Sequence, residues 1–371
     1  MNGQSINRES VQPLYEQVKK LIYGEIREGN YRPGEIIPAE REFCKKLNVS
    51  RNTVRKAISQ LVNEGYLYKV QGHGTFVSGD QEKQVDEDLQ NKIIGVILAD
   101  DTEYDSNILK GVEKVASQKN YNVIFASYQN ILEKELEIIK KVLRQKVSGL
   151  IIMPGSVSAV MQFVSGLKAK DLPFIFVDTR LPDDEIDCVV SSNIKGGYLA
   201  AEHLIKLGHK KIAFLKEDIS EMTVEDRLSG YKKALKDYDF EIDSDLMLTV
   251  SDASSEEKQE EMSVFYNQQK PTAVIAHNDY LALDFYKMCR KNNINIPDDV
   301  SLVGYDNIES IKHIDVPLTS IAQFPQEMGM VAAERVLEKI ENKNSRKKEL
   351  KKQIYYPVEL VVRQSTAEFE S

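Results

Sequence analysis

The chain has 371 residues, is 42% hydrophobic and carries a formal net charge of −9, so it is long enough for more than one core. Its 3 cysteines are too few and too scattered for a disulfide framework, which favours a reducing compartment. The N-terminus lacks a signal-peptide pattern, and no run approaches the roughly 18 apolar residues of a membrane span. We therefore expect a soluble, cytoplasmic protein with no membrane partner.

The N-terminal region differs in charge from the rest of the chain. Residues 1–80 contain 12 Lys and Arg against 9 Asp and Glu, a balance of +3, which leaves −12 for the remainder. A basic region on an acidic protein favours an anionic partner for that region. The excess is small, so chance is the alternative.

Three helices and a hairpin are predicted within residues 1–78. Apolar residues recur at helical spacing after Pro13, and "PAEREFCKKLNV" predicts a second, short helix. Ser50 is a good N-cap, so a third helix should begin at Arg51. The segment "GYLYKVQGHGTFVS" predicts two strands joined by a glycine-containing turn. This order is typical of a winged helix-turn-helix.

The first turn of the third helix carries the groups that read DNA bases. Arg51, Asn52 and Arg55 should lie away from the apolar stripe of that helix. Arginine pairs bidentately with guanine and asparagine with adenine in the major groove. Taken singly, each is equally compatible with a solvated helix face, and His73 with an ordinary turn residue. Their combination with the cap, the turn and the wing favours DNA binding.

Residues 11–78, from "PLYEQVKKLIYGEI" to "YKVQGHGTFV", resemble the winged-helix domain of the GntR family of bacterial regulators. The resemblance implies DNA contacts from the second helix, the third helix and the wing. The residues implied are Arg41, Arg51, Asn52, Thr53, Arg55, Gln71, Gly72 and His73. The residue type at Asn52 varies among such proteins, so the base that it reads stays open.

Residues 79–91 are predicted to be a linker, and residues 92–371 an effector and dimerisation domain. The segment "SGDQEKQVDEDLQN" is polar and acidic, as linkers are. After it, buried-strand patterns such as "KIIGVILAD" and "SLVGYD" alternate with helical patterns. Such alternation predicts an α/β fold with doubly wound parallel sheets, and the length fits two halves.

The carboxyl ends of these predicted strands carry short polar side chains. They include Asp100 and Asp101, Gly155 and Ser156, Asp178 with Thr179 and Arg180, Asn278 and Asp279, and Asp306 with Asn307. Ligands bind at the carboxyl ends of strands in doubly wound sheets, and such groups suit a polyhydroxylated ligand. The alternative is that each Asp or Asn only caps the helix that follows it.

Residues 92–366 resemble the effector domain of the LacI/GalR repressors, through "NIKGGYLAAEHLIKLGHKKIAFL", "PTAVIAHNDYLAL" and "IPDDVSLVGYDN". The resemblance implies a two-lobed, periplasmic-binding-protein-like fold with three crossovers. The first lobe would be 92–189 with 324–351, and the second 190–323 with the C-terminal strand region. The implied effector-binding residues are Asp101, Tyr104, Ser156, Asp178, Arg227, Asn278 and Asp306. Where related domains stack an aromatic ring on the sugar, this chain has Ala253, so Tyr104 or Phe176 would have to serve.

A GntR-type head on a LacI-type body is similar to the architecture of bacterial arabinose repressors. That similarity implies a pentose effector, L-arabinose first, and a homodimer that binds double-stranded operator DNA and is released by the sugar. A hexose or disaccharide, and a ligand that acts as a corepressor, remain open. We expect dimerisation through the body, with "MGMVAAERVLEKI" as a candidate helix.

No pattern for catalysis, a cofactor or a metal site is found in the sequence. The 5 histidines include no HExxH and no His/Cys cluster. The glycine pair at 196–197 lacks phosphate-loop spacing and is better explained by helix packing. We expect a regulator that is not an enzyme; a sugar-binding protein without a regulatory role is the alternative from another class.

Overall fold

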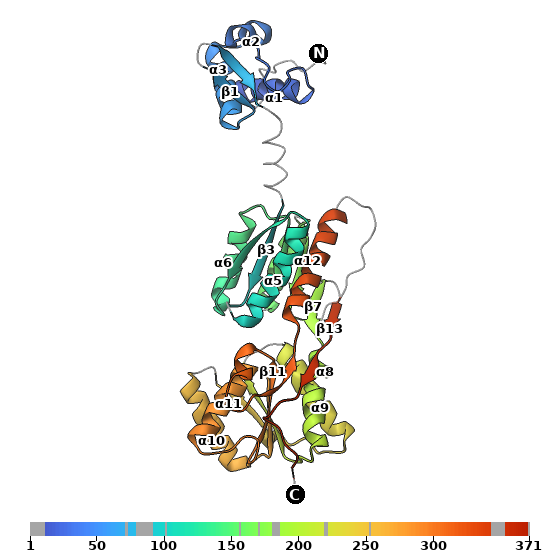
Figure 1. Ribbon diagram of the computed structural model, residues 1–371. Helices are drawn as coiled ribbons and strands as arrows, with labels where there is room; N and C mark the ends of the chain where they lie inside the picture. Colours follow the sequence, from blue (N-terminus) through green and yellow to red (C-terminus); the bar gives the residue numbers. More distant parts are fainter. Residues whose placement is uncertain are drawn as a thin grey trace. The chain divides into compact units, whose positions relative to one another are not determined.

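The computed structural model describes residues 12–70, 73–78, 92–100, 102–155, 157–169, 171–179, 186–218, 222–251, 254–342 and 353–369. The chain divides into two compact units, residues 1–91 and 92–371, termed here the head and the body (Figure 1). No helix of the described residues has the length and apolar character needed to cross a bilayer.

The head is the winged helix-turn-helix that the sequence predicts. It contains α1 (Leu14–Arg27), α2 (Glu40–Leu47), α3 (Arg51–Asn63) and the antiparallel strands β1 (Leu67–Val70) and β2 (Gly74–Val77). Asn48, in the left-handed conformation at φ 51°, ends α2 and makes the tight turn before α3. Val18, Phe43 and Ile58 are among the buried residues through which the three helices pack on one core.

The body is built on two sheets of six strands each. The first-lobe sheet has the order β13-β7-β6-β5-β3-β4 and is parallel throughout. Its strands are β3 (Ile93–Leu98), β4 (Asn122–Ser127), β5 (Gly149–Ile152), β6 (Phe174–Val177), β7 (Cys188–Ser191) and β13 (Gln353–Tyr356). Its helices are α5 (Glu103–Gln118), α6 (Leu132–Leu143), α7 (Val157–Ala169) and α12 (Pro325–Asn342).

The second-lobe sheet has the order β14-β12-β11-β10-β8-β9 and is parallel except for β14. Its strands are β8 (Ile212–Glu217), β9 (Met247–Val250), β10 (Ala273–Ala276), β11 (Ser301–Asp306), β12 (Thr319–Ala322) and β14 (Glu359–Val361). Its helices are α8 (Asn193–Lys206), α9 (Met222–Asp237), α10 (Ser255–Gln269) and α11 (Asp279–Lys291), with short 3-10 turns η1 (Ser244–Leu246) and η2 (Glu309–Lys312).

Helices cover both faces of each sheet, which is why the central strands are apolar throughout. In the first lobe α5 and α12 pack on one face of the sheet and α6 and α7 on the other. In the second lobe α8 and α9 cover one face and α10 and α11 the other. The alternation in the sequence is therefore confirmed as a doubly wound α/β fold.

The chain passes between the lobes three times, after β7, after β12 and after β13. These crossings refine the lobe boundaries that the sequence suggested. β7 extends the first lobe to Ser191, and β13 pairs with β7 in the first-lobe sheet, so only β14 of the C-terminal strand region belongs to the second lobe. The short strands β7, β9, β12, β13 and β14 were not among the strands that the sequence pattern predicted.

The helix proposed for dimerisation does not have a free apolar face. In α12, Met328, Ala332, Val336 and Leu337 are buried in the first-lobe core, where they pack with residues of α5 and of the sheet. Because these side chains are covered within one subunit, a dimer contact through α12 would have to use the remaining residues of the helix, and its part in dimerisation stays a prediction.

Helices α5 and α12 approach closely at two glycines. A Cβ atom at Gly111 would lie 1.9 Å from the carbonyl oxygen of Gln326, and one at Gly329 would lie 2.1 Å from that of Ile108. Contact between the two backbones is possible only because these positions lack side chains.

Replacing Gly111 by alanine should therefore lower the free energy of unfolding by about 1–3 kcal/mol, because a methyl group forces the two helices apart. Urea denaturation followed by circular dichroism measures this effect. The matched control is Gly166→Ala in α7, where no atom lies within 4 Å of the added methyl group. Because alanine has a higher helix propensity than glycine, this change should raise the free energy of unfolding by up to about 1 kcal/mol. Equal effects at the two sites would contradict the close contact.

Candidate functional site: a DNA-binding head and a buried arginine cluster

The N-terminus of α3 is built as the sequence predicts. The Ser50 hydroxyl accepts a hydrogen bond from the Thr53 backbone N–H at 3.2 Å, which caps the helix. The Thr53 hydroxyl lies 2.8 Å from that of Ser50, so it belongs to the cap as well as to the predicted contact set. Because Val54 and Ile58 are buried against the core, the opposite face of α3 is exposed.

Arg51 and Arg55 lie on this exposed face and share one carboxylate. Arg51 Nε lies 3.2 Å from Glu40 Oε2, and Arg55 Nη2 lies 3.3 Å from the same oxygen. The two arginine side chains are 71% and 50% exposed, so their guanidinium groups remain accessible. Burial by itself would raise the pKa of Glu40, but hydrogen bonds from Arg55 and Arg51 outweigh it and lower that pKa. Glu40 is therefore ionised and holds the two cations together.

For the other predicted DNA-contacting residues, the structure shows the element on which each lies and its exposure. Arg41 follows Glu40 in α2 and is exposed, and Asn52 is exposed on α3. His73 lies in the exposed turn immediately before β2. Gln71 and Gly72 lie outside the described residues. The sequence did not identify Glu40, although its place beside Arg41 at the start of α2 was a signal.

In the body, the buried side chain of Arg227 contacts several polar side chains at the ends of strands and helices. Arg227 is 5% exposed. Its Nε donates to Asn193 Oδ1 at 2.9 Å, and its Nη1 donates to the His277 carbonyl oxygen at 2.6 Å. The guanidinium carbon lies 3.8 Å from the centre of the Tyr305 ring, and Nη1 lies 3.8 Å from Asp306 Oδ1. We call Arg227, Asn193, Tyr305, Asp306 and Gln323 the Arg227 cluster.

The cluster joins the two lobes through Gln323, which lies in the crossover after β12. Gln323 Nε2 donates to Asp306 Oδ1 at 2.6 Å, and Tyr104 of the first lobe donates from its hydroxyl to Gln323 Oε1 at 3.3 Å. Predicted site residues from both lobes are thus connected by one amide. The sequence did not identify Gln323, Asn193 or Tyr305; the position of Tyr305 directly before Asp306 was the available signal.

Charge in this region is strongly coupled. Burial by itself would lower the pKa of Arg227, but the negative charges of Asp306 and Asp178 help to raise it above its usual value. The pKa of Tyr104 is raised well above its usual value, first by burial and then by the charges of Asp178 and Asp306. The guanidinium is therefore charged and the phenol neutral, so the site offers both donors and acceptors.

A bend in the backbone at Asp306 is held by hydrogen bonds to Asp279. Asp306 and Asn307 both have positive φ, at 106° and 59°. The next residue, Ile308, donates its N–H to Asp279 Oδ2 at 2.9 Å, and Ser320 Oγ donates to Asp279 Oδ1 at 2.8 Å. The pKa of Asp279 is raised well above its usual value, first by burial and then by the charge of Asp306. Asp279 therefore supports the bend that presents Asp306.

Several predicted effector-site residues are not shown to join the Arg227 cluster. Asn278 Oδ1 accepts from the Leu281 N–H at 2.8 Å and so caps α11, as the structural alternative had it. Phe176 is fully buried in the first-lobe core, so the suggestion that it stacks on a ligand is wrong. Asp101, Ser156 and Ala253 lie outside the described residues.

Two glycines set the position of Arg227. A Cβ atom at Gly197 of α8 would lie 1.9 Å from the Arg227 carbonyl oxygen, and one at Gly230 of α9 would lie 2.0 Å from that of Ile194. The backbones of α8 and α9 therefore touch where Arg227 leaves α9. Of the predicted pair at 196–197, Gly197 is confirmed as a helix-packing glycine, whereas a Cβ atom at Gly196 would lie 2.1 Å from the hydroxyl oxygen of Tyr305 in β11.

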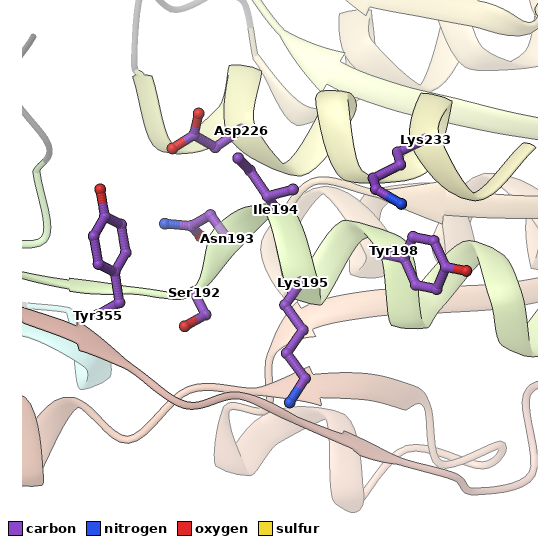
Figure 2. Close-up of a pocket in the computed structure, with 8 residues that line it drawn as sticks. All are labelled: Ser192, Asn193, Ile194, Lys195, Tyr198, Asp226, Lys233 and Tyr355. Atoms are coloured by element: carbon purple, nitrogen blue, oxygen red, sulfur yellow. The ribbon is translucent and has the colours of Figure 1, made fainter. Parts of the chain in front are cut away.

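A hollow of about 550 Å³ lies along the start of α8. It is lined by Ser192, Asn193, Ile194, Lys195, Tyr198, Asp226, Lys233 and Tyr355. Figure 2 shows Tyr198 and Lys233 together at one end, where Lys233 Nζ lies 5.0 Å from the ring centre, and Tyr355 at the other end. Asn193 lines this hollow and also binds Arg227, so the hollow and the Arg227 cluster share a residue.

Residues 91–360 match the family of periplasmic binding proteins and the sugar-binding domain of the LacI family, and residues 14–77 match the gntR family of bacterial regulatory proteins. The chain belongs to the LacI-type family and carries a GntR-family head. Two arabinose metabolism transcriptional repressors are 33% identical to it over nearly its whole length, so it is a transcriptional repressor of the LacI and arabinose-repressor type.

Relatives extend over nearly the whole chain. The arabinose metabolism transcriptional repressor of Geobacillus stearothermophilus is 33% identical over 370 residues, covering 97% of this chain and 100% of the relative. That of Halalkalibacterium halodurans is 33% identical over 367 residues, covering 96% and 97%. A LacI-family regulator from Enterococcus faecium, solved with bound ribose, is 29% identical with a TM-score of 0.65, covering 75% of this chain and 100% of that one.

Next to Tyr104, the carboxyl of Asp105 is 4% exposed, and burial is the main cause that raises its pKa to about 6. A raised pKa means that the folded state holds the proton more tightly than the unfolded chain. The ionised group therefore destabilises the fold above about pH 6, and this cost disappears as the pH falls from about 6 towards 4.

Asp105→Asn should consequently stabilise the protein relative to wild type at pH 8, by about 1–3 kcal/mol, and lose this advantage near pH 4.5. Urea denaturation across that pH range measures the difference. Glu113→Gln, on the exposed face of the same helix, is the control and should show no such trend. A difference for Asp105→Asn that does not change with pH would contradict the assignment.

Proposed function

We propose that the protein is a cytoplasmic, homodimeric repressor that binds operator DNA through its head and releases it when a small sugar, L-arabinose first, binds its body. The observation that carries the proposal is the Arg227 cluster, in which a buried charged guanidinium faces a carboxylate and an amide beside the junction of the lobes. The near full-length similarity to two arabinose metabolism repressors supports the choice of sugar.

The chemistry of the cluster suits a polyhydroxylated ligand. Each sugar hydroxyl is both donor and acceptor, and it gains most from charged partners that are already fixed in place. Arg227 offers donors, Asp306 offers acceptors, and Gln323 and Tyr104 bring the first lobe to the same place. Ribose in the related Enterococcus faecium regulator is consistent with a pentose.

DNA recognition is assigned to the exposed pair at the start of α3. Arg51→Ala and Arg55→Ala should each weaken specific operator binding by about 1–3 kcal/mol, because each removes a bidentate base contact. A fluorescence-anisotropy titration with operator and scrambled duplexes at fixed salt measures the loss of specificity.

The matched control for these variants is Lys19→Ala. It removes the same charge from the head, but Lys19 pairs with Glu64 at the opposite end of α3. It should leave the ratio of operator to scrambled-duplex affinity unchanged. If the control and the arginine variants behave alike, the arginines supply only general charge and do not read bases.

Sugar recognition is assigned to Asp306. Asp306→Asn keeps the shape of the side chain and suits the positive φ, but it removes the negative charge that faces Arg227. We expect at least tenfold weaker L-arabinose binding by calorimetry and unchanged operator affinity without sugar. The control is Asp315→Asn, an exposed carboxylate paired with Arg290.

The same assay discriminates between the ligands and the direction of the response. L-arabinose, D-ribose, D-glucose and a disaccharide are titrated into the operator complex. Release by L-arabinose supports the proposal, release by another sugar corrects the effector, and tighter DNA binding makes the ligand a corepressor. No response to any sugar with intact DNA binding would refute the assignment of the effector site.

A further inference from the structure

Glu103 connects the two lobes beside the Arg227 cluster. It is the first residue of α5 in the first lobe, and both of its carboxylate oxygens accept from the backbone N–H of Glu309, at 3.0 and 3.1 Å. Glu309 is the first residue of η2 in the second lobe. A carboxylate from one lobe therefore caps the start of a helical turn in the other.

A second residue of the second lobe lies near the start of α5. The pKa of Tyr280, from α11, is raised above its usual value, first by burial and then by the charges of Asp306 and Glu103. Tyr280 and Glu309 of the second lobe are therefore both close to Glu103 of the first lobe, which requires the lobes to be close together.

These contacts adjoin the predicted effector site along the chain on both sides. Glu103 precedes Tyr104, whose hydroxyl reaches Gln323, and Glu309 lies three residues after Asp306. Asp279 fixes the intervening segment through the Ile308 N–H. A ligand that binds Asp306 therefore acts on the same short segment that Glu103 binds.

The strength of the contact suits a reversible device. A hydrogen bond from a backbone N–H to a carboxylate is stronger than one between neutral groups. Because Glu103 is exposed, however, water competes for its carboxylate oxygens. The contact can thus favour the joined state of the lobes without locking it. A contact present in only one of two lobe arrangements shifts the populations of the two arrangements. It thereby changes the apparent affinity for a ligand that binds only one of them.

We propose that Glu103 and the Glu309 backbone N–H form a latch that sets the affinity for the sugar without touching it, by holding the two lobes together. Both residues are positioning residues in this role. The inference rests on the proposed function for its ligand, but the latch itself is measurable without sugar.

The test compares two variants at one position. Glu309→Pro removes the N–H donor; it stands first in η2, and Ile308 before it has ψ 157°, as a residue before proline requires. Glu309→Ala keeps the N–H and removes only the exposed pairs with Lys312 and His313. Glu103→Ala removes the acceptor, and Glu103→Gln restores part of it.

With L-arabinose and the full chain, Glu309→Pro and Glu103→Ala should each weaken binding on the order of tenfold, mainly through faster dissociation. The double variant should be no worse than either single one, because both remove the same bond. Glu309→Ala should bind L-arabinose as tightly as wild type. The affinity of Glu103→Gln should lie between those of wild type and Glu103→Ala. Melting temperature and operator affinity without sugar should not change.

Amide hydrogen exchange gives a readout that needs no sugar. In Glu103→Ala, the N–H groups of residues 309–312 should exchange faster than in wild type. If exchange there is unchanged, or if Glu309→Ala weakens sugar binding as much as Glu309→Pro, the latch is refuted. Faster exchange in a protein that ignores every sugar would keep the latch and refute the proposed function.

Discussion

The buried guanidinium of Arg227 is the charge around which the body is organised. A charge removed from water is tolerated only when it is paired and hydrogen-bonded, and Arg227 has a carboxylate, an amide oxygen, a carbonyl oxygen and an aromatic face. These partners come from different strands and helices. Any group that alters one of them changes the electrostatic balance of all, which makes the cluster responsive to a polar ligand.

The head uses charge in the opposite way. Arg51 and Arg55 are exposed, and the single carboxylate that joins them, Glu40, adds little to stability because the pairs face water. Exposure keeps the arginines available to DNA, whereas burial makes Arg227 sensitive to its surroundings. Under the proposed function, one residue type would serve a large, polyanionic partner in the head and a small, neutral ligand in the body.

The crossovers turn these local contacts into a property of the whole body. Gln323 lies in one crossover, and Asn193 follows directly after another, so two partners of the Arg227 cluster stand where the lobes are joined. Movement of one lobe against the other must rearrange these hydrogen bonds. The inter-lobe contact of Glu103 lies close by, so the proposed effector site and the contacts that hold the lobes together share one hydrogen-bond network.

The sequence by itself determined the elements whose signals are local. The cap at Ser50, the apolar stripe of α3 and the runs of the central strands followed from spacing alone, and the resemblance of "VGYDN" to a family motif located Asp306. Only the tertiary structure decided which groups meet. Asn193 and Gln323 are far from Arg227 and Asp306 in the chain and became partners through close backbone contact and a crossover, and Asn278 became a cap. Short strands such as β13 and the burial of Phe176 were likewise set by packing, because a local pattern records which residues avoid water but not which residues they meet.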